Sequence, residues 1–292
     1  MPELPEVETV RRGLMPTMVG ARVDKVQLRR PDIRFPFPVA FERRLSGRRI
    51  VDVNWRAKYL LFALDSGETL IAHLGMSGSF RIENGEAATP GNFLRERSKD
   101  PKHDHVVIVL DNGSIVTYND PRRFGFMDLA ASGQLADHPR VSGLGAEPLS
   151  PEFDANCLAK LFAGARTPLK AALLDQKRIA GLGNIYVCEA LFRARLAPTR
   201  PAGIFADARG APTRAAAAIV EAIRNVLEEA IEAGGSTLRD HRQANGELGY
   251  FQHVFKVYDR EGLRCVRERC RGVVARTVHS GRSTFYCGVC QR

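Results

Sequence analysis

The first half of the chain carries short apolar runs of the kind that form β-strands. Between Gly20 and Leu129, turn residues such as Asp65-Ser66-Gly67 separate seven such runs. Short strands spaced by turns are typical of a β-sandwich or barrel. The runs are RVDKVQLRR, RRIVDVNW, KYLLFAL, TLIAHLG, HVVIVLD, SIVTYND and FGFMDLA. The pattern therefore predicts an N-terminal domain built from β-strands.

One short helix is predicted ahead of these strands, over residues 1–14. Val7, Val10 and Leu14 recur at helical spacing and share one face. Pro5 suits the first turn of a helix, where its missing N–H costs nothing.

The apolar pattern becomes helical from residue 151 onward. Four stretches carry it: DANCLAKLFAGA, LKAALLDQKRIAG, NIYVCEALFRARL and PTRAAAAIVEAIRNVLEEAIEAG. Residues 131–150 are rich in Gly, Ser, Ala and Pro, which is typical of a linker. The polar stretch Ile82–Lys102 predicts a long surface insertion. We therefore expect a strand domain over 2–130, a helical domain over 151–252 and a C-terminal module over 253–292.

Length and charge narrow the class of protein. A chain of 292 residues predicts about two domains. No apolar run approaches the ~18–20 residues that cross a bilayer, and the N-terminus lacks the order of a secretory signal. The net charge of +10 favours a polyanionic partner, with nucleic acid the leading candidate. A basic membrane-surface protein would need a long basic amphipathic helix, which the pattern does not contain.

Four of the six cysteines crowd the C-terminal end. They form a C-x4-C pair, a spacer of sixteen residues and a C-x2-C pair. The segment GVVARTVHSGRSTFYC, from Gly272 to Cys287, reads as two strands joined by a Ser-Gly turn. Two cysteine pairs across a short hairpin can hold one Zn²⁺ tetrahedrally. Two disulfides are the alternative, but they need an oxidising compartment, and nothing in the sequence indicates export. The pattern therefore favours zinc on Cys265, Cys270, Cys287 and Cys290.

Pro2 is a candidate nucleophile. An initiator methionine before a small residue is commonly removed, which would leave Pro2 with a free secondary amine that titrates at about 8. Attack of this amine on an aldehydic sugar carbon would give an iminium, an electron sink that drives elimination. Glu3 could then move protons. Taken alone, a Met-Pro start also occurs in many chains without catalytic meaning.

Several other motifs have both a functional and an ordinary interpretation. Met and Phe on the turns His73–Gly78 and Asp120–Gly125 could be core residues, or wedges into a DNA base stack beside arginines. The turn Gly181–Tyr186 could hold a phosphate at the next helix, or simply connect two helices. Lys58 at the head of an apolar strand is ordinarily a snorkelling surface residue. The run Lys102–His105 could hold a metal, but a mixed loop before a strand fits it better.

Taken together, these motifs resemble the formamidopyrimidine-DNA glycosylase family of base-excision repair enzymes. The motifs PELPEVET, KYLL, HLGMSG, KHDHV, DPRRFG, GLGNIY and GRSTFYCGVC occur in the family's order from residue 2 to 292. The resemblance implies an α+β multidomain fold. Its parts would be an N-terminal β-sandwich with flanking helices, a helix–two-turn–helix domain and a C-terminal zinc ribbon with one structural Zn²⁺.

The resemblance also implies catalytic roles. Pro2 matches the nucleophile that attacks C1′ of the damaged nucleotide, and Glu3 matches the general acid/base. Lys58 matches a proton donor during elimination, and Arg282 matches the arginine of the final δ-elimination. The implied reaction removes oxidised purines, such as 8-oxoguanine and formamidopyrimidines, through a Schiff base. Successive β- and δ-eliminations at the abasic site then cut the strand.

Further positions are implied to contact damaged double-stranded DNA. Three side chains match those that fill the gap left by the everted base: Met76, Arg122 and Phe124. Other matches to DNA-contacting positions are His103, Arg122, Arg166, Lys170 and Asn184. The segment Gly234–Gln252 matches the loop that closes over the flipped base. The family implies a monomer in the bacterial cytoplasm, associated with the nucleoid.

Two departures and two alternatives accompany the resemblance. The first cysteine pair is C-x4-C where the common family form is C-x2-C, and the Ile82–Lys102 insertion is longer than expected. The related endonuclease VIII-like enzymes, which prefer oxidised pyrimidines, usually have Gly where Leu4 stands. A non-catalytic zinc-ribbon DNA-binding protein is the alternative from another class.

Overall fold

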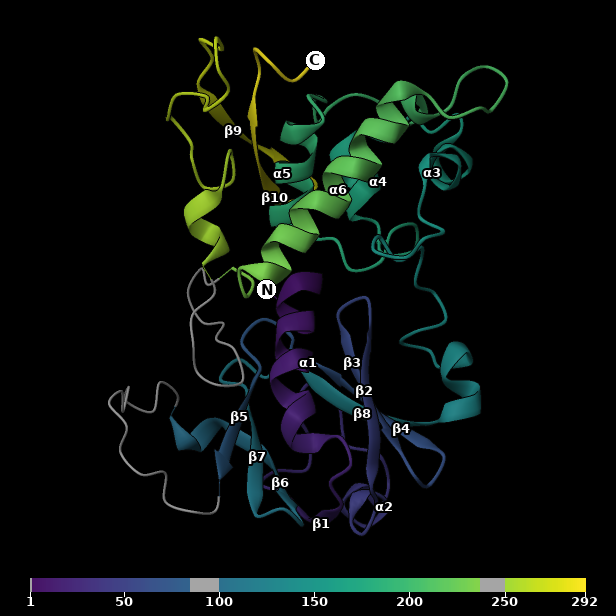
Figure 1. The fold of residues 1–292 in the computed structure, drawn as a ribbon, viewed down its shortest axis with the longest axis vertical. Coiled ribbons are helices and arrows are strands. Elements are labelled where there is room, and N and C mark those ends of the chain that lie inside the picture. Colours follow the sequence, from purple (N-terminus) through teal and green to yellow (C-terminus); the bar gives the residue numbers. More distant parts are fainter. Residues whose placement is uncertain (1, 85–99, 237–249) are drawn as a thin grey trace. The chain divides into compact units, whose positions relative to one another are not determined.

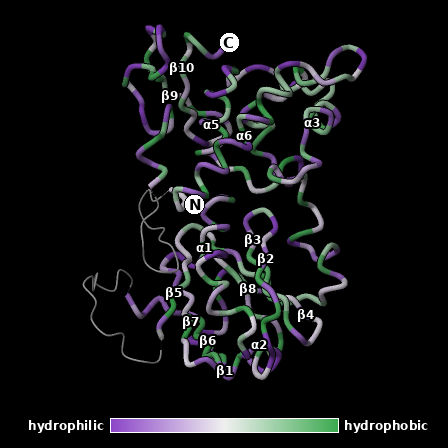
Figure 2. The backbone as a smooth tube through the Cα atoms, in the orientation of Figure 1, coloured by the Kyte–Doolittle hydropathy of each residue, from purple (hydrophilic) through white to green (hydrophobic). Residues whose placement is uncertain are grey.

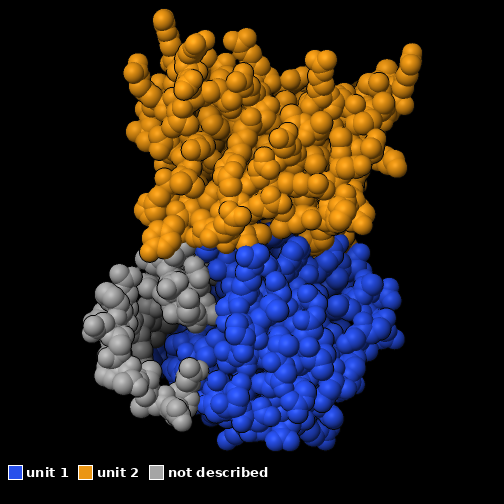
Figure 3. Space-filling model, viewed as in Figure 1, with its two compact units in different colours: residues 1–142, 234–249 blue, residues 143–233, 250–292 orange. Residues whose placement is uncertain are grey.

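The computed structural model describes residues 2–84, 100–236 and 250–292. The chain forms two compact units (Figure 3). The first contains residues 1–142 and 234–249, and the second contains residues 143–233 and 250–292. No helix within the described ranges is long and apolar enough to cross a membrane.

The first unit begins with helix α1 (Leu4–Met18) (Figure 1). The predicted helix is confirmed, with Pro5 in its first turn, but it continues past Leu14 to Met18. Its apolar face is fully buried in the core of this unit, with Val7, Val10 and Leu14 at most 1% exposed. Helix α1 is therefore fixed to the strand domain.

Two antiparallel four-stranded sheets follow. One has the order β1-β6-β7-β5 and the other the order β2-β3-β4-β8. The strands are β1 (Val23–Leu28), β2 (Ile50–Arg56), β3 (Tyr59–Leu64), β4 (Glu68–His73), β5 (Ser79–Asn84), β6 (Asp104–Leu110), β7 (Ser114–Asn119) and β8 (Phe126–Ala131). Helix α2 (Phe41–Leu45) lies between β1 and β2, the 3₁₀ turn η1 (Pro101–His103) directly precedes β6, and the 3₁₀ turn η2 (Ser132–Asp137) follows β8. All seven predicted strands are present.

A single hydrophobic core joins both sheets and α1, which confirms the predicted sandwich. Val26 and Ile108 of one sheet share this core with Val53 and Phe62 of the other. The hydrophobic stretches of these strands can be followed in Figure 2. One element departs from the expectation: β5 lies at a sheet edge and reaches Asn84, into the stretch predicted as an insertion. Residues 85–99 of that stretch lie outside the described residues.

The second unit is helical, as predicted. It contains α3 (Ala155–Phe162), α4 (Leu169–Leu174), α5 (Asn184–Arg193), η3 (Ala202–Phe205), α6 (Arg214–Glu232) and η4 (Phe251–Val254). Their buried faces form one core that includes Tyr186, Phe205 and Ile223. Helix α4 is shorter than its apolar pattern suggested, because the buried Ile179 and Ala180 belong to the turn that leads into α5.

The chain ends in the predicted hairpin of β9 (Val274–His279) and β10 (Arg282–Cys287). Ser280 and Gly281 form its turn, with φ of 51° and 72°. Two residues with positive φ are the signature of a type I′ turn, which matches the twist of the flanking strands. The turn therefore fixes the register that places Arg282 opposite His279.

Candidate functional site

The start of α1 is built around two carboxylates. Glu3 is the N-cap residue and Glu6 the third helical residue, and the two form a reciprocal capping box. The Glu3 backbone N–H donates to Glu6 Oε2 at 2.8 Å. Glu3 is only 3% exposed and Pro2 is also buried. The two residues predicted to carry catalysis therefore sit in an ordered, water-poor corner.

Glu6 has a second task that the sequence interpretation missed. Its Oε1 accepts hydrogen bonds from the backbone N–H and the hydroxyl of Ser236, at 2.8 and 2.9 Å. The neighbouring Gly235 has a φ of +80°, and a Cβ there would come within 3.2 Å of Glu6 Oε1. One carboxylate thus ties the first turn of α1 to residues 234–236. The spacing Glu3-x-x-Glu6 was the available signal, since it is a capping-box pattern.

Lys58 lies at the turn between β2 and β3 and is 7% exposed. Its neighbour Tyr59 pairs directly with His73 of β4. Burial first, and then the positive charges of Lys58, Arg34 and Arg140, lower the pKa of His73 to about 4. The His73 ring is therefore neutral at pH 7, and its Nδ1 accepts from the Gly75 N–H at 3.0 Å. Nε2 consequently carries the proton.

His73 is a candidate site residue that the sequence interpretation left without a role. It is the first residue of the HLGMSG motif, so the motif itself was the signal. Its ring stacks on Phe126 at 5.4 Å, and the guanidinium of Arg140 lies 5.0 Å from the same Phe126 ring. Several cationic groups around one neutral imidazole create a positive potential, which suits a phosphate.

The turns carrying Met76 and Phe124 are held together by Asp120. This buried carboxylate accepts from the Ser77 hydroxyl at 2.5 Å and from the Gly125 N–H at 2.8 Å. A Cβ on Gly75 would overlap the backbone of Phe124, so the close approach requires glycine there. The sequence interpretation quoted both motifs but did not single out Asp120.

The three predicted wedge residues lie on these two joined turns. Met76 is 37% and Phe124 42% exposed, an unusual exposure for large apolar side chains. The Arg122 guanidinium lies 4.9 Å from the Phe124 ring centroid, and its backbone N–H donates to Ser77 Oγ at 3.1 Å. Two apolar side chains and an arginine are thus presented together.

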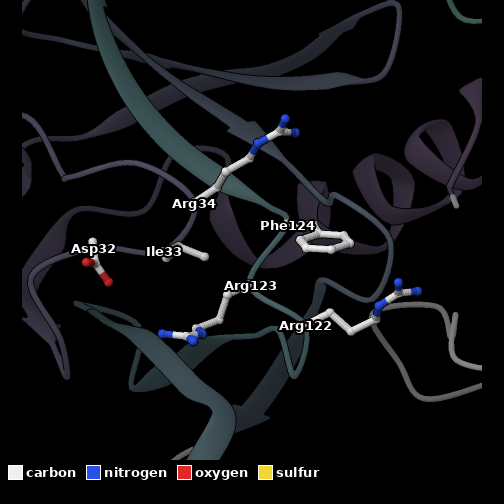
Figure 4. Close-up of a pocket in the computed structure, with 6 residues that line it drawn as sticks. All are labelled: Asp32, Ile33, Arg34, Arg122, Arg123 and Phe124. Atoms are coloured by element: carbon white, nitrogen blue, oxygen red, sulfur yellow. The ribbon is translucent and has the colours of Figure 1, made fainter.

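A pocket of about 430 Å³ opens beside these turns (Figure 4). The loop that supplies Arg34 is fixed there by a backbone hydrogen bond from Arg34 N–H to Gly125 O at 3.2 Å. The residues that line the pocket are Asp32, Ile33, Arg34, Arg122, Arg123 and Phe124. Three arginines against one aspartate make the pocket cationic and suited to an anionic group.

In the second unit, Lys170 and Asn184 both point at the hairpin. Lys170 is fully buried, and its Nζ donates to Ser283 O at 3.0 Å and to Thr284 Oγ1 at 2.7 Å. Asn184 Nδ2 donates to the same Ser283 O at 2.9 Å. Arg282, directly before Ser283, is exposed. Of the other predicted DNA contacts, Arg166 is exposed between α3 and α4, whereas His103 is half-buried in η1 of the first unit.

The four C-terminal cysteines converge. The sulfur atoms of Cys265, Cys270, Cys287 and Cys290 all lie within 4.8 Å of one another. Cys265 and Cys290 are 3.8 Å apart, and Cys270 and Cys287 are 3.7 Å apart. A tetrahedral site with Zn–S bonds of about 2.3 Å requires sulfur separations of about 3.8 Å. The cluster can therefore hold a metal ion.

The four thiols do not titrate alike: burial raises the pKa of Cys265, and burial together with the neighbouring thiols raises the pKa of Cys290 to about 12. Burial alone would raise the pKa of Cys287, but the N–H groups of Cys290 and Val289 and the neighbouring thiols outweigh it and lower the pKa to about 7. One thiolate is therefore accessible near neutral pH, and a thiolate is the form that binds metal.

Comparison with known proteins agrees with this arrangement. Residues 1–127 match the family model of the formamidopyrimidine-DNA glycosylase N-terminal domain, and residues 144–242 match that of the formamidopyrimidine-DNA glycosylase H2TH domain. The chain is 60% identical to a formamidopyrimidine-DNA glycosylase of Rhizobium meliloti, over the full length of both proteins.

Solved structures agree over nearly the whole chain. The crystal structure of the MutM (Fpg) protein of Thermus thermophilus matches with a TM-score of 0.81 and 42% identity, over 99% of this chain and 98% of that one. The wild-type Lactococcus lactis Fpg, in complex with DNA containing N7-benzyl-Fapy-dG, matches with a TM-score of 0.82 and 30% identity over both full chains. The chain therefore belongs to the formamidopyrimidine-DNA glycosylase family.

Proposed function

We propose that this base-excision repair enzyme removes oxidised purines from double-stranded DNA through a Schiff base on Pro2, and then cuts the strand at the abasic site. Its membership of a glycosylase family with AP lyase activity carries the enzymatic assignment. The buried corner formed by Pro2, Glu3 and Glu6 is the observation that supports this residue-level mechanism.

The chemistry follows from the secondary amine. After loss of Met1, the Pro2 nitrogen forms a bond to C1′, and the bond from C1′ to the base breaks. The base leaves with that electron pair and takes up a proton. The Pro2 nitrogen gives up its own proton. The C1′–O4′ bond then breaks, O4′ takes up a proton, and the nitrogen lone pair forms the C=N bond of an iminium, whose positive charge withdraws electrons from the sugar. Loss of a proton from C2′ then expels the 3′ phosphate, and a second elimination expels the 5′ phosphate.

Glu3 and Lys58 supply the proton transfers in this proposal. Glu3 directly follows the nucleophile, and its position is fixed by the capping box. Lys58 is a nearly buried ammonium at a strand turn, where it can donate to a leaving oxygen. We add His73 to the implied contacts, as a neutral donor through Nε2 to a DNA phosphate.

Met76, Phe124 and Arg122 would occupy the gap left by the flipped nucleotide. Insertion of apolar side chains compensates for the lost stacking, which costs a few kcal/mol per flipped base. The implied DNA contacts of His103, Arg166, Lys170 and Asn184 remain predictions, as does the proton-transfer role of Arg282. Residues 237–249 of the predicted closing loop lie outside the described residues.

The metal is proposed to be one structural Zn²⁺ on the four cysteines. All four donors are sulfur, and their separations fit a tetrahedral ion. In functional terms we divide the chain into a catalytic domain over 2–130, a linker over 131–150, a helix–two-turn–helix domain over 151–252 and a zinc ribbon over 253–292. The enzyme would act as a monomer on chromosomal DNA, in association with the nucleoid, as its net charge of +10 favours.

The test is single-turnover cleavage of three matched duplexes, carrying 8-oxoguanine, thymine glycol or an abasic site. We expect 8-oxoguanine to be removed faster than thymine glycol, and Pro2→Gly to slow strand cleavage on every duplex. Pro16→Ala, a control elsewhere on the same helix, should cleave like the wild type. Unchanged cleavage by Pro2→Gly would refute the nucleophile. A preference for thymine glycol would favour the endonuclease VIII-like branch, and binding without cleavage would favour a non-catalytic DNA-binding protein.

A further inference from the structure

The outer edge of strand β10 presents a backbone carbonyl to two helices. In a two-residue hairpin, the two residues that flank the turn form a hydrogen-bonded pair. The residues of the next pair direct their backbone N–H and C=O groups away from the partner strand. Arg282 and His279 flank the turn, so Ser283 belongs to the outward-facing pair. Its carbonyl therefore points away from β9, along the unpaired edge of the hairpin.

Two side chains from the helical core fill this edge. Lys170 of α4 and Asn184 of α5 donate to the same Ser283 oxygen, at 3.0 and 2.9 Å. Lys170 is fully buried, although a lysine is among the residues least often found inside. An ammonium so far from water must be held by acceptors, because burial otherwise disfavours its charge. The position of Lys170 is therefore tightly coupled to the hairpin.

Thr284 completes the attachment. Its hydroxyl accepts from Lys170 Nζ at 2.7 Å and lies 2.9 Å from His279 Nδ1. Because an ammonium can only donate, the Thr284 hydroxyl is the acceptor in its bond with Lys170. The network thus reaches both strands on either side of the turn. On the other side of the hairpin, Arg276 Nε donates to Ser283 Oγ at 3.1 Å.

We propose that Lys170 and Asn184 are positioning residues: through Ser283 and Thr284 they fix the hairpin tip and so set the place of Arg282. The inference rests on the role proposed above for Arg282 in the final elimination. It gives Lys170 and Asn184 a task in addition to the phosphate contacts that the family resemblance implies. The Ser283 carbonyl accepts two hydrogen bonds, and only one peptide separates Arg282 from this residue. Loss of these hydrogen bonds therefore displaces the arginine directly.

Thr284→Val is the sharpest perturbation. It keeps the shape of a side chain that is 1% exposed and removes only the hydroxyl. Lys170 still has Ser283 O as an acceptor, so the variant is expected to fold. Thr284→Ser keeps the hydroxyl and serves as the matched control. Lys170→Met is the second variant, and it leaves Ser283 O with Asn184 as a donor.

The readout is the ratio of δ- to β-elimination products on abasic-site DNA, resolved by their different strand ends. We expect this ratio to fall roughly tenfold or more in Thr284→Val and Lys170→Met, because misplacement by an ångström can cost about 100-fold. Thr284→Ser should restore the wild-type ratio. A general loss of protein stability would lower the yields of both elimination products together and leave the δ-to-β ratio unchanged. That result, or no effect at all, would overturn the proposal.

Arg282→Ala separates this proposal from the proposed function. If Arg282→Ala lowers the δ-to-β ratio while Thr284→Val does not, Arg282 keeps its role and the positioning network is refuted. If Arg282→Ala leaves the ratio unchanged, the assignment of Arg282 fails. Amide hydrogen exchange of residues 282–287 in the DNA-free protein then tests the network alone. Faster exchange in Thr284→Val than in Thr284→Ser supports the attachment, and equal exchange contradicts it.

Discussion

Glu6→Gln is the substitution that most directly tests how the N-terminal corner is held. The Glu6 carboxylate is 1% exposed, and its hydrogen bonds include one from the Glu3 N–H and two from Ser236. Glutamine has the same size but only one acceptor oxygen. If that oxygen faces the two donors of Ser236, the new NH₂ group faces the Glu3 N–H. Two donors then oppose each other in a buried site.

The expected cost can be worked out from these contacts. A buried N–H left without an acceptor costs about 1–3 kcal/mol, and the two remaining bonds lose the strengthening that a charged acceptor provides. We therefore expect Glu6→Gln to lower the free energy of unfolding by about 2–4 kcal/mol. Because Glu3 directly follows Pro2, we also expect Schiff-base formation to slow by roughly tenfold or more.

Urea unfolding gives the free energy, and the rate of borohydride-trapped adduct under single-turnover conditions gives the chemical effect. Glu221→Gln is the matched control, because Glu221 is exposed on α6 and the same chemical change there should alter stability by less than about 0.5 kcal/mol. If Glu6→Gln also changed the free energy of unfolding by less than about 0.5 kcal/mol relative to the wild type, the idea that this carboxylate organises the corner would be refuted. An unchanged trapping rate in a destabilised variant would show that the corner stabilises the fold but does not position the nucleophile.

Three further predictions concern other parts of the molecule. Asp120→Ala removes the acceptor of the Ser77 hydroxyl and the Gly125 N–H, and of a longer bond from the Tyr118 hydroxyl, so urea unfolding should show a loss of about 2–6 kcal/mol; a loss below about 1 kcal/mol would contradict that role. The pKa of His73 falls from 6.5 to about 4 on folding. The unfolded chain therefore binds more protons between these values, and stability should rise with pH across that window. His73→Gln should flatten this rise, and an unchanged slope would mean that the ring is protonated in the folded protein. Arg267, inside the C-x4-C loop, donates to Phe192 O at 2.7 Å and lies over its ring. Arg267→Ala should speed chelator-driven loss of metal, and an unchanged rate would show that the loop needs no such anchor.

The fold was predictable where local pattern and burial coincide. The seven strands, the four helical stretches and the type I′ hairpin all have a periodicity or a turn signal of their own. Strand β5 was missed because Ser79–Asn84 is an edge strand whose sequence runs into a polar stretch. Helix α4 was overestimated because Ile179 and Ala180 are buried without being helical. Apolar residues in a sequence indicate which positions are buried, but burial alone does not specify the backbone conformation.

The site was predictable in its residue types and not in its connections. The resemblance named Pro2 and Lys170, but not the contacts that fix them. Glu6 and Ser236 are 230 positions apart in sequence, and Lys170 and Thr284 are 114 apart. No local pattern encodes such pairs, because they exist only once separate segments have packed. Lys58, at the head of an apolar strand, was interpreted from the pattern alone as an ordinary surface lysine, yet it is only 7% exposed.

The central claim is that the amine of Pro2 becomes covalently joined to the sugar of the damaged nucleotide. Its most direct test is mass spectrometry of proteolytic fragments from the borohydride-reduced complex with an 8-oxoguanine duplex. We predict that the fragment carrying the sugar begins at Pro2 and that the added mass lies on its ring nitrogen. A sugar attached to Lys58 or to any other side chain, or the absence of any conjugate, would contradict this account.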